Sequence, residues 1–171
     1  DHRIVGAVVA VVHRGEVVHL GGYGWADLET RTPADPVSSL FRIASISKPF
    51  VWTAVMQLVE AGRLALDDDV NEHLTAFSIP DTFAEPVRIR HLLTHTPGFE
   101  DQAIGMNART LEERIPLETY LAEHMPARVR PPGRHAAYSN WGTTLAAYIV
   151  QEVSGQNWAD YIDEHILEPL A

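Results

Sequence analysis

Two long apolar segments with helical periodicity limit the folds that are open to this chain. One runs from about Ser45 to Ala61 and is followed by Gly62, and the other runs from Asn140 to Ser154 and is followed by Gly155. Glycine directly after a periodic segment is typical of a helix C-terminus. We therefore predict two long helices, of which the first is central and buried. Its expected buried face comprises Val51, Val55, Leu58 and Val59.

The first 25 residues have the composition and pattern of strands. Residues 4–13 and 16–25 are rich in valine and other strand-forming residues, and the short turn His13-Arg14-Gly15-Glu16 joins them. This arrangement predicts a β-hairpin. Residues 26–39 contain turn residues throughout and are expected to be ordered but irregular.

Shorter helical patterns occupy the rest of the chain. Helices are predicted over Val87–Thr94, Leu111–His124 and Trp158–Leu167, with a loop rich in proline and glycine over residues 128–138. Residues 45–171 therefore form a mostly helical region after the hairpin. At 171 residues the whole chain is predicted to be a single domain.

Composition excludes several classes of function. The formal net charge of −10 argues against nucleic-acid binding, because phosphates are bound by clustered cations. The absence of cysteine excludes a thiol nucleophile and a thiolate metal site. No apolar run reaches the roughly 20 residues that a membrane-spanning helix needs. The acidic run Asp67-Asp68-Asp69 is interpreted as a capping or solvated surface rather than a cation site.

One basic residue differs from all the others. Of the 13 basic residues, Lys48 is the single lysine and the rest are arginine. Arginine cannot lose its proton in a protein, whereas a desolvated lysine can become a neutral base. A lysine kept against this bias is consistent with a need for a removable proton, although chance placement on a helix surface explains the count equally well.

Ser45 and Lys48 form the first candidate catalytic pair. Positions three apart at the start of a helix share one face, with Cβ atoms about 5 to 6 Å apart. Burial beside the apolar helix and the helix N-terminus both favour the neutral amine, which would activate the Ser45 hydroxyl as a nucleophile. The Ser45 backbone amide is the expected donor to the oxyanion that acyl transfer creates.

Two other interpretations of this segment stay open. A Ser-x-x-Lys spacing is common by itself, and Ser45 would then simply cap the helix while Lys48 extends into solvent. Ser47 is a second hydroxyl, but it faces away from Lys48 in a helix and is treated as secondary.

The sequence Tyr138-Ser139-Asn140 supplies a second set of candidates. It ends the 128–138 loop and leads directly into the second long helix. A phenol near an amine can exchange a proton with it, and the Asn140 amide can bind both a lysine and a substrate carbonyl. The alternative is a turn in which Asn140 acts as the helix N-cap.

Three segments together resemble a known family. They are Phe41 to Lys48 (FRIASISK), His91 to Gly98 (HLLTHTPG) and Pro132 to Asn140 (PGRHAAYSN). In this order and spacing they are similar to the class C β-lactamases and the penicillin-binding-protein-like serine hydrolases, in which a Ser-x-x-Lys motif carries the nucleophile. The resemblance implies a β-lactamase-like α/β (α+β) fold, with an antiparallel sheet flanked by helices and a helical subdomain.

The resemblance also implies roles for the candidate residues. Ser45 would be the acylated nucleophile, Lys48 its proton acceptor, Tyr138 a proton shuttle to the leaving group, and Asn140 a partner of both the substrate and Lys48. The implied activity is hydrolysis of a small acyl substrate through an acyl-enzyme, without cofactor or metal. The implied substrates are β-lactams, D-amino-acid peptides and short-chain carboxylic esters, with an esterase or peptidase favoured over a dedicated β-lactamase. The implied location is periplasmic or secreted.

One part of the family pattern is not found. A Lys or His followed two residues later by Gly, on the edge strand of the sheet, would lie beyond Leu170-Ala171. We therefore expect a partial domain that lacks the C-terminal strands, which puts turnover by this chain alone in question. The His91 to Gly98 segment is a structural signature in the family rather than a catalytic one.

Two other classes of function remain as alternatives. His91 and His95 are four residues apart, with Glu100 and Asp101 nearby, which is a possible metal-ligand spacing. This alternative is weak, because the intervening residues include no glutamate base of the kind that a zinc protease uses, and proline and glycine interrupt the helix directly afterwards. The other alternative is a non-catalytic, penicillin-binding-like ligand-binding relative or an inactive fragment.

Overall fold

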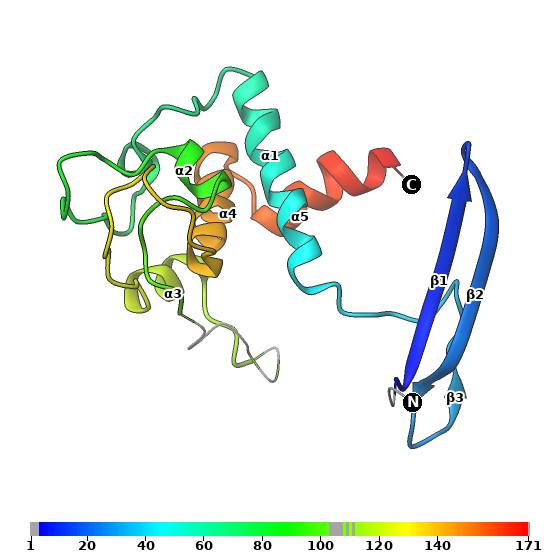
Figure 1. Ribbon diagram of the computed structural model, residues 1–171. Helices are drawn as coiled ribbons and strands as arrows, with labels where there is room; N and C mark the ends of the chain where they lie inside the picture. The colour runs from blue at the N-terminus through cyan, green and yellow to red at the C-terminus, as the bar shows by residue number, and fades with distance from the viewer. Residues whose placement is uncertain (1–3, 103–107, 109, 111, 171) are drawn as a thin grey trace. The chain divides into compact units, whose positions relative to one another are not determined.

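The strand-rich and helical parts of the sequence form two units in the computed structural model, Asp1–Ala44 and Ser45–Ala171 (Figure 1). The structure describes residues 4–102, 108, 110 and 112–170. That residues 1–171 form a single domain stays a prediction.

The first unit contains a three-stranded antiparallel sheet in the order β1-β2-β3. Its strands are β1 Gly6–His13, β2 Glu16–Asp27 and β3 Thr32–Pro33. Arg14 and Gly15, between β1 and β2, have φ values of 50° and 84°. Two successive residues with positive φ form the turn whose twist matches a hairpin, so the predicted β-hairpin and its turn are confirmed.

The pairing of β1 with β2 contains one irregularity. Val11 lies opposite His19, whereas Val12 lies opposite Val17, so that Val18 is an extra residue on β2. An extra residue of this kind is a β-bulge, which increases the local twist. Strand β2 also extends past the predicted end of the hairpin, because its last residues pair with β3.

Both faces of the hairpin present apolar side chains. Adjacent residues of a strand point to opposite faces, yet Val11 and Val12 are 45% and 62% exposed. Other exposed apolar side chains of the two strands are Val9, Val17, Val18, Leu20, Tyr23 and Trp25. The hairpin is therefore apolar on both sides rather than alternating between an apolar and a polar face.

The first long helix of the second unit begins later than the sequence predicts. Ser45 lies in a 3₁₀ turn, η1 Ala44–Ser47, and the helix α1 runs over Lys48–Glu60. Pro49 has no N–H to donate to the Ser45 carbonyl, so a regular α-helix through Ser45 would lack a hydrogen bond. The predicted start was therefore wrong, while the helix and its end before Gly62 are confirmed.

The second long helix, α4 Asn140–Ser154, matches its predicted bounds. Ser139 caps its N-terminus by accepting a hydrogen bond of 3.0 Å from the Gly142 N–H, so the N-cap is Ser139 and not Asn140. At the other end Gly155 adopts a φ of 76°, the left-handed conformation that commonly ends a helix.

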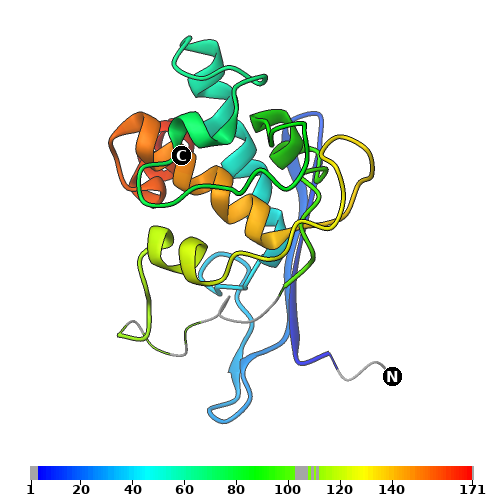
Figure 2. The same ribbon diagram turned by 90° about the vertical axis from the view of Figure 1, so that its left-hand side faces the viewer.

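Helix α4, and not α1, is the central element of this unit. Nine of its residues are buried, whereas α1 buries four and leaves Met56 44% exposed. In both views of the structure α4 lies between α2 and α3 (Figures 1 and 2). Its neighbours are α1, α2 Ile89–Leu93, α3 Leu117–Glu123, α5 Trp158–Ile162 and the short helix η2 Val70–His73.

The remaining helices follow the predictions with shorter bounds. Helix α2 falls within the predicted range, whereas α3 covers only the end of the predicted Leu111–His124. Pro116 is the N-cap of α3 and disfavours helical structure at the residue before it, which explains the late start. Leu111 itself lies outside the described residues. Helix α5 continues into a π-helical turn, η3 Asp163–Leu167, and a 3₁₀ turn, η4 Glu168–Leu170.

Within the described ranges, no helix has the length and apolar character needed to cross a membrane.

Candidate active site

Ser45 lies in the turn η1, directly before α1, and its side chain is exposed. Side chains three positions apart in a 3₁₀ helix eclipse one another, so Ser45 and Lys48 lie on the same side. The Lys48 Nζ atom donates a hydrogen bond of 3.0 Å to Ser45 Oγ. The contact predicted from the Ser-x-x-Lys spacing is therefore present.

Lys48 is the first residue of α1 and is half-buried. Its Nζ atom donates a second hydrogen bond, of 2.8 Å, to Asn140 Oδ1 and lies 4.7 Å from the centre of the Tyr138 ring. An ammonium at this position is attracted by the negative face of the ring. These contacts hold the amine beside Ser45, so the interpretation in which Lys48 extends into solvent was wrong.

Tyr138 contacts Ser45 from the loop before α4. Its hydroxyl donates a hydrogen bond of 2.5 Å to Ser45 Oγ, and the residue is 46% exposed. The hydrogen bond with Lys48, and then the one with Ser45, lower the pKa of the Tyr138 hydroxyl against the opposing effects of burial and of the Asp101 charge. A lowered pKa makes the phenol a better partner for proton exchange near neutral pH.

Ser45 Oγ therefore lies between two groups that can take or return a proton. Both donate to it in the structure, and loss of a proton from either one makes that group an acceptor for the Ser45 hydroxyl. Asn140 and Lys48 are 92 residues apart, and Tyr138 and Ser45 are 93 residues apart. Contact between α1 and α4 brings the two segments together.

The rival hydroxyl of Ser47 lies outside this arrangement. Ser47 is the N-cap residue of α1, but its side chain makes no capping hydrogen bond and is exposed. The Lys48 amine bonds to Ser45, which supports the secondary place given to Ser47.

His95 contacts the candidate site in a way that the sequence does not reveal. Helix α2 ends at Leu93, and His95 has a φ of 55°, so His91 and His95 do not share a helical face as the metal alternative requires. His91 Nδ1 accepts a hydrogen bond of 3.0 Å from the Arg88 N–H at the start of α2. His95 Nδ1 accepts one of 3.3 Å from the Ser139 N–H. The geometry assumed for the metal site was therefore wrong.

No local pattern identifies His95 as part of this site. Its spacing from His91 indicates a metal ligand, and the segment that contains it indicates a structural motif. The signal that would reveal its contact with the Tyr138 loop is a left-handed backbone conformation, which is uncommon for a residue other than glycine.

The acidic run Asp67-Asp68-Asp69 has mainly local partners. Asp69 Oδ1 accepts a hydrogen bond of 2.9 Å from the Asn71 N–H and so caps η2. Asp68 accepts one of 2.8 Å from the Ala65 N–H, which is the main cause of its lowered pKa, and its carboxylate lies 3.0 Å from His73 Nε2. Asp67 forms an ion pair with an arginine of α2. These contacts support the predicted capping and surface role.

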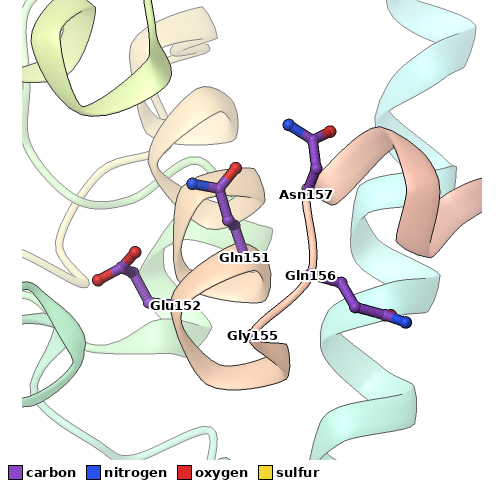
Figure 3. Close-up of a pocket in the computed structure, with 5 residues that line it drawn as sticks. All are labelled: Gln151, Glu152, Gly155, Gln156 and Asn157. Atoms are coloured by element: carbon purple, nitrogen blue, oxygen red, sulfur yellow. The ribbon is translucent and has the colours of Figure 1, made fainter.

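A polar pocket lies at the C-terminal end of α4, opposite the end that carries Asn140 (Figure 3). The helix has 15 residues, and a rise of 1.5 Å per residue separates its ends by about 21 Å. Asn140 is the first residue of α4, so this pocket is distinct from the hydrogen-bonded cluster of Ser45, Lys48, Tyr138 and Asn140. The residues that line it are Gln151, Glu152, Gly155, Gln156 and Asn157.

Comparison with known proteins identifies a family. The Beta-lactamase family model matches residues 1–171. Esterase EstB of Burkholderia gladioli is 34% identical over 182 residues, which cover 99% of this chain and 46% of the esterase. The chain spans only 34% to 46% of the length of the curated relatives it matches.

Solved structures agree with this assignment. The octameric penicillin-binding protein homologue from Pyrococcus abyssi has a TM-score of 0.82 and 32% identity, covering 98% of this chain and 39% of that one. The D-amino acid amidase from Ochrobactrum anthropi SV3 has a TM-score of 0.78 and 28% identity, covering 98% and 45%. The predicted β-lactamase-like α/β fold class and the family resemblance are thus confirmed. The chain belongs to the Beta-lactamase family.

Proposed function

We propose that this protein is a serine hydrolase that acts through an acyl-enzyme, with Ser45 as the nucleophile. The observation that carries the proposal is that Ser45 Oγ lies 3.0 Å from Lys48 Nζ and 2.5 Å from the Tyr138 hydroxyl. A hydroxyl beside two groups that can accept its proton is the arrangement of an activated nucleophile. The names of two relatives, an esterase and a D-amino acid amidase, support hydrolysis of an acyl substrate.

In the acylation step, the neutral Lys48 amine accepts the hydroxyl proton of Ser45 while Ser45 Oγ forms a bond to the acyl carbon of the substrate. The carbonyl oxygen of the substrate becomes negatively charged. We propose the Ser45 backbone amide as one hydrogen-bond donor to this oxygen. Asn140, which binds Lys48 at 2.8 Å, would also orient the substrate.

Tyr138 completes the proton transfer. Its hydroxyl gives a proton to the alcohol or amine that leaves as the bond to the acyl carbon breaks, and it recovers a proton from Lys48. Water then attacks the acyl carbon of the Ser45 ester and gives one proton to the neutral Lys48 amine, and this proton passes to Ser45 Oγ as the bond to the acyl carbon breaks and the acid is released. The lowered pKa of Tyr138 and the position of its ring beside the Lys48 amine support this exchange.

A carboxylic ester or a D-amino-acid peptide or amide is the proposed substrate class, in preference to a β-lactam. The relatives named above support this choice. Rates measured with p-nitrophenyl esters, a D-Ala-D-Ala peptide and nitrocefin on the full-length protein test it. Turnover of nitrocefin without turnover of the other two would show that a β-lactam is the preferred substrate and would contradict the proposed class.

Covalent labelling tests the proposed nucleophile. A fluorophosphonate probe should add one adduct to the full-length protein, located at Ser45 by peptide mass mapping, and Ser45→Ala should remove it. Ser47→Ala is the matched control, because that hydroxyl lies outside the hydrogen-bonded cluster, and it should be labelled like the wild type. An adduct at another residue, or reversible binding of penicillin without any adduct, would favour the non-catalytic alternative.

A further inference from the structure

His95 contacts three consecutive residues of the loop that carries Tyr138. Its carbonyl oxygen accepts a hydrogen bond of 2.7 Å from the Ala137 N–H, and its Nδ1 atom accepts one of 3.3 Å from the Ser139 N–H. Its ring lies 4.6 Å, centre to centre, from the ring of Tyr138. The backbone is therefore held on both sides of Tyr138, and the side chain between these points packs on His95.

The ring of His95 also contacts the helix that carries Lys48. Trp52 of α1 packs against it edge to face, with a distance of 5.8 Å between ring centres and an angle of 67°. His95 thus connects the helix that carries Lys48 with the loop that carries Tyr138. Its φ of 55° is uncommon for a residue with a side chain, so this placement has an energetic cost that the contacts must offset.

We propose that His95 is a positioning residue that holds the Tyr138 hydroxyl against Ser45. The inference rests on the proposed function, in which Tyr138 exchanges a proton during acyl transfer. A misplacement of about 1 Å in such a group can lower a rate about 10²-fold, so the support of the loop matters for the chemistry.

The protonation state of His95 agrees with this role. Nδ1 accepts from Ser139 only while it carries no hydrogen, which the neutral ring allows. Burial, and secondarily the charge of Lys48, lower the pKa of His95 and so favour the neutral form. The groups that act on the Tyr138 hydroxyl are Lys48, Ser45 and Asp101, and His95 packs against its ring.

Substitutions at His95 distinguish the contribution of its ring from that of its Nδ1 hydrogen-bond acceptor. His95→Phe keeps a ring and removes the acceptor. His95→Asn keeps an acceptor on Cγ, and asparagine tolerates positive φ better than most residues. His95→Gly removes both groups without backbone strain and serves if His95→Phe does not fold. The matched control is His135→Asn, which changes an exposed histidine of the same loop.

Two measurements on the full-length protein test the proposal. One is the rate of fluorophosphonate labelling, and the other is the titration of Tyr138 followed by NMR of ¹³C-labelled tyrosine, with the signal assigned by Tyr138→Phe. We expect His95→Phe or His95→Gly to lower the labelling rate about 10²-fold and to raise the titration midpoint of Tyr138. We expect His95→Asn to recover the rate to within about tenfold of the wild type, and His135→Asn to match the wild type in both measurements.

The outcomes distinguish this proposal from the proposed function. A folded His95→Phe or His95→Gly protein with the labelling rate and Tyr138 titration of the wild type would overturn the positioning role. If the wild type is not labelled at Ser45 but these variants still shift the Tyr138 titration, the proposed function fails and the positioning role stands.

Discussion

The hairpin exposes many of its apolar side chains to solvent, whereas the central helix of the helical unit buries them. Val12 and Val17 of the hairpin are 62% and 60% exposed, whereas Leu145 and Ile149 of α4 are fully buried. A strand that is apolar on both faces has the pattern of a strand covered on both sides, while α4 already has neighbours around it. The comparison teaches that the helical unit has a buried core around α4, whereas the hairpin exposes apolar side chains on both of its faces.

The candidate site belongs entirely to the helical unit. Ser45 and Lys48 come from η1 and α1, and Tyr138 and Asn140 come from the start of α4 and the loop before it. Changes to the candidate site or to the buried core of the helical unit should therefore affect activity or stability strongly, and matched changes in the hairpin should have small effects.

Lys48→Arg is expected to have the largest effect. Arginine keeps the positive charge but cannot lose its proton, so the rate of acylation by a p-nitrophenyl ester should fall about 10³-fold, within the range that general base catalysis contributes. The control in the hairpin is Arg14→Lys at the β1-β2 turn, which should leave the rate unchanged. A Lys48→Arg protein that reacts at the rate of the wild type would contradict the role of Lys48.

Truncation of an apolar side chain should have the next largest effect, and its cost in stability should differ between the two units. Leu145→Ala leaves a cavity beside fully buried neighbours and should lower the free energy of unfolding by about 3 kcal/mol. Val17→Ala, on the exposed hairpin, should lower it by less than about 1 kcal/mol. Urea denaturation of both variants measures the difference. Equal losses would show that the hairpin side chain is as well packed in solution as the core of α4.

Two glycines with similar backbone conformations give the smallest expected difference. Gly98 and Gly15 have φ values of 87° and 84°, so alanine is strained at both. A Cβ atom at Gly98 would lie 2.0 Å from the Arg130 carbonyl oxygen, whereas at Gly15 it meets nothing within 4 Å. Gly98→Ala should therefore destabilise by about 2 kcal/mol more than Gly15→Ala, as measured by thermal unfolding. Identical melting temperatures would contradict the close approach at Gly98.

Helix ends show where prediction from the sequence succeeds and where it fails. The bounds of α4 were predicted correctly because Gly155 adopts the left-handed conformation that ends a helix. The start of α1 was wrong because Pro49 removes one hydrogen bond from a helix that would pass through Ser45. Helix α3 is shorter than predicted because Pro116 disfavours helical structure at the residue before it.

The contact between Ser45 and Lys48 could be predicted from the sequence alone, because backbone geometry fixes which side chains meet within one helical turn. The hairpin turn at Arg14-Gly15 could also be predicted from the sequence, because it too depends on residues that are adjacent in the chain. Only the tertiary structure decided that Asn140 and Tyr138 reach the same pair across more than 90 residues, since this depends on how α1 packs against α4. The place of His95 beside Tyr138 was also a tertiary outcome, because long-range contacts hold its backbone in a conformation that its own sequence does not favour.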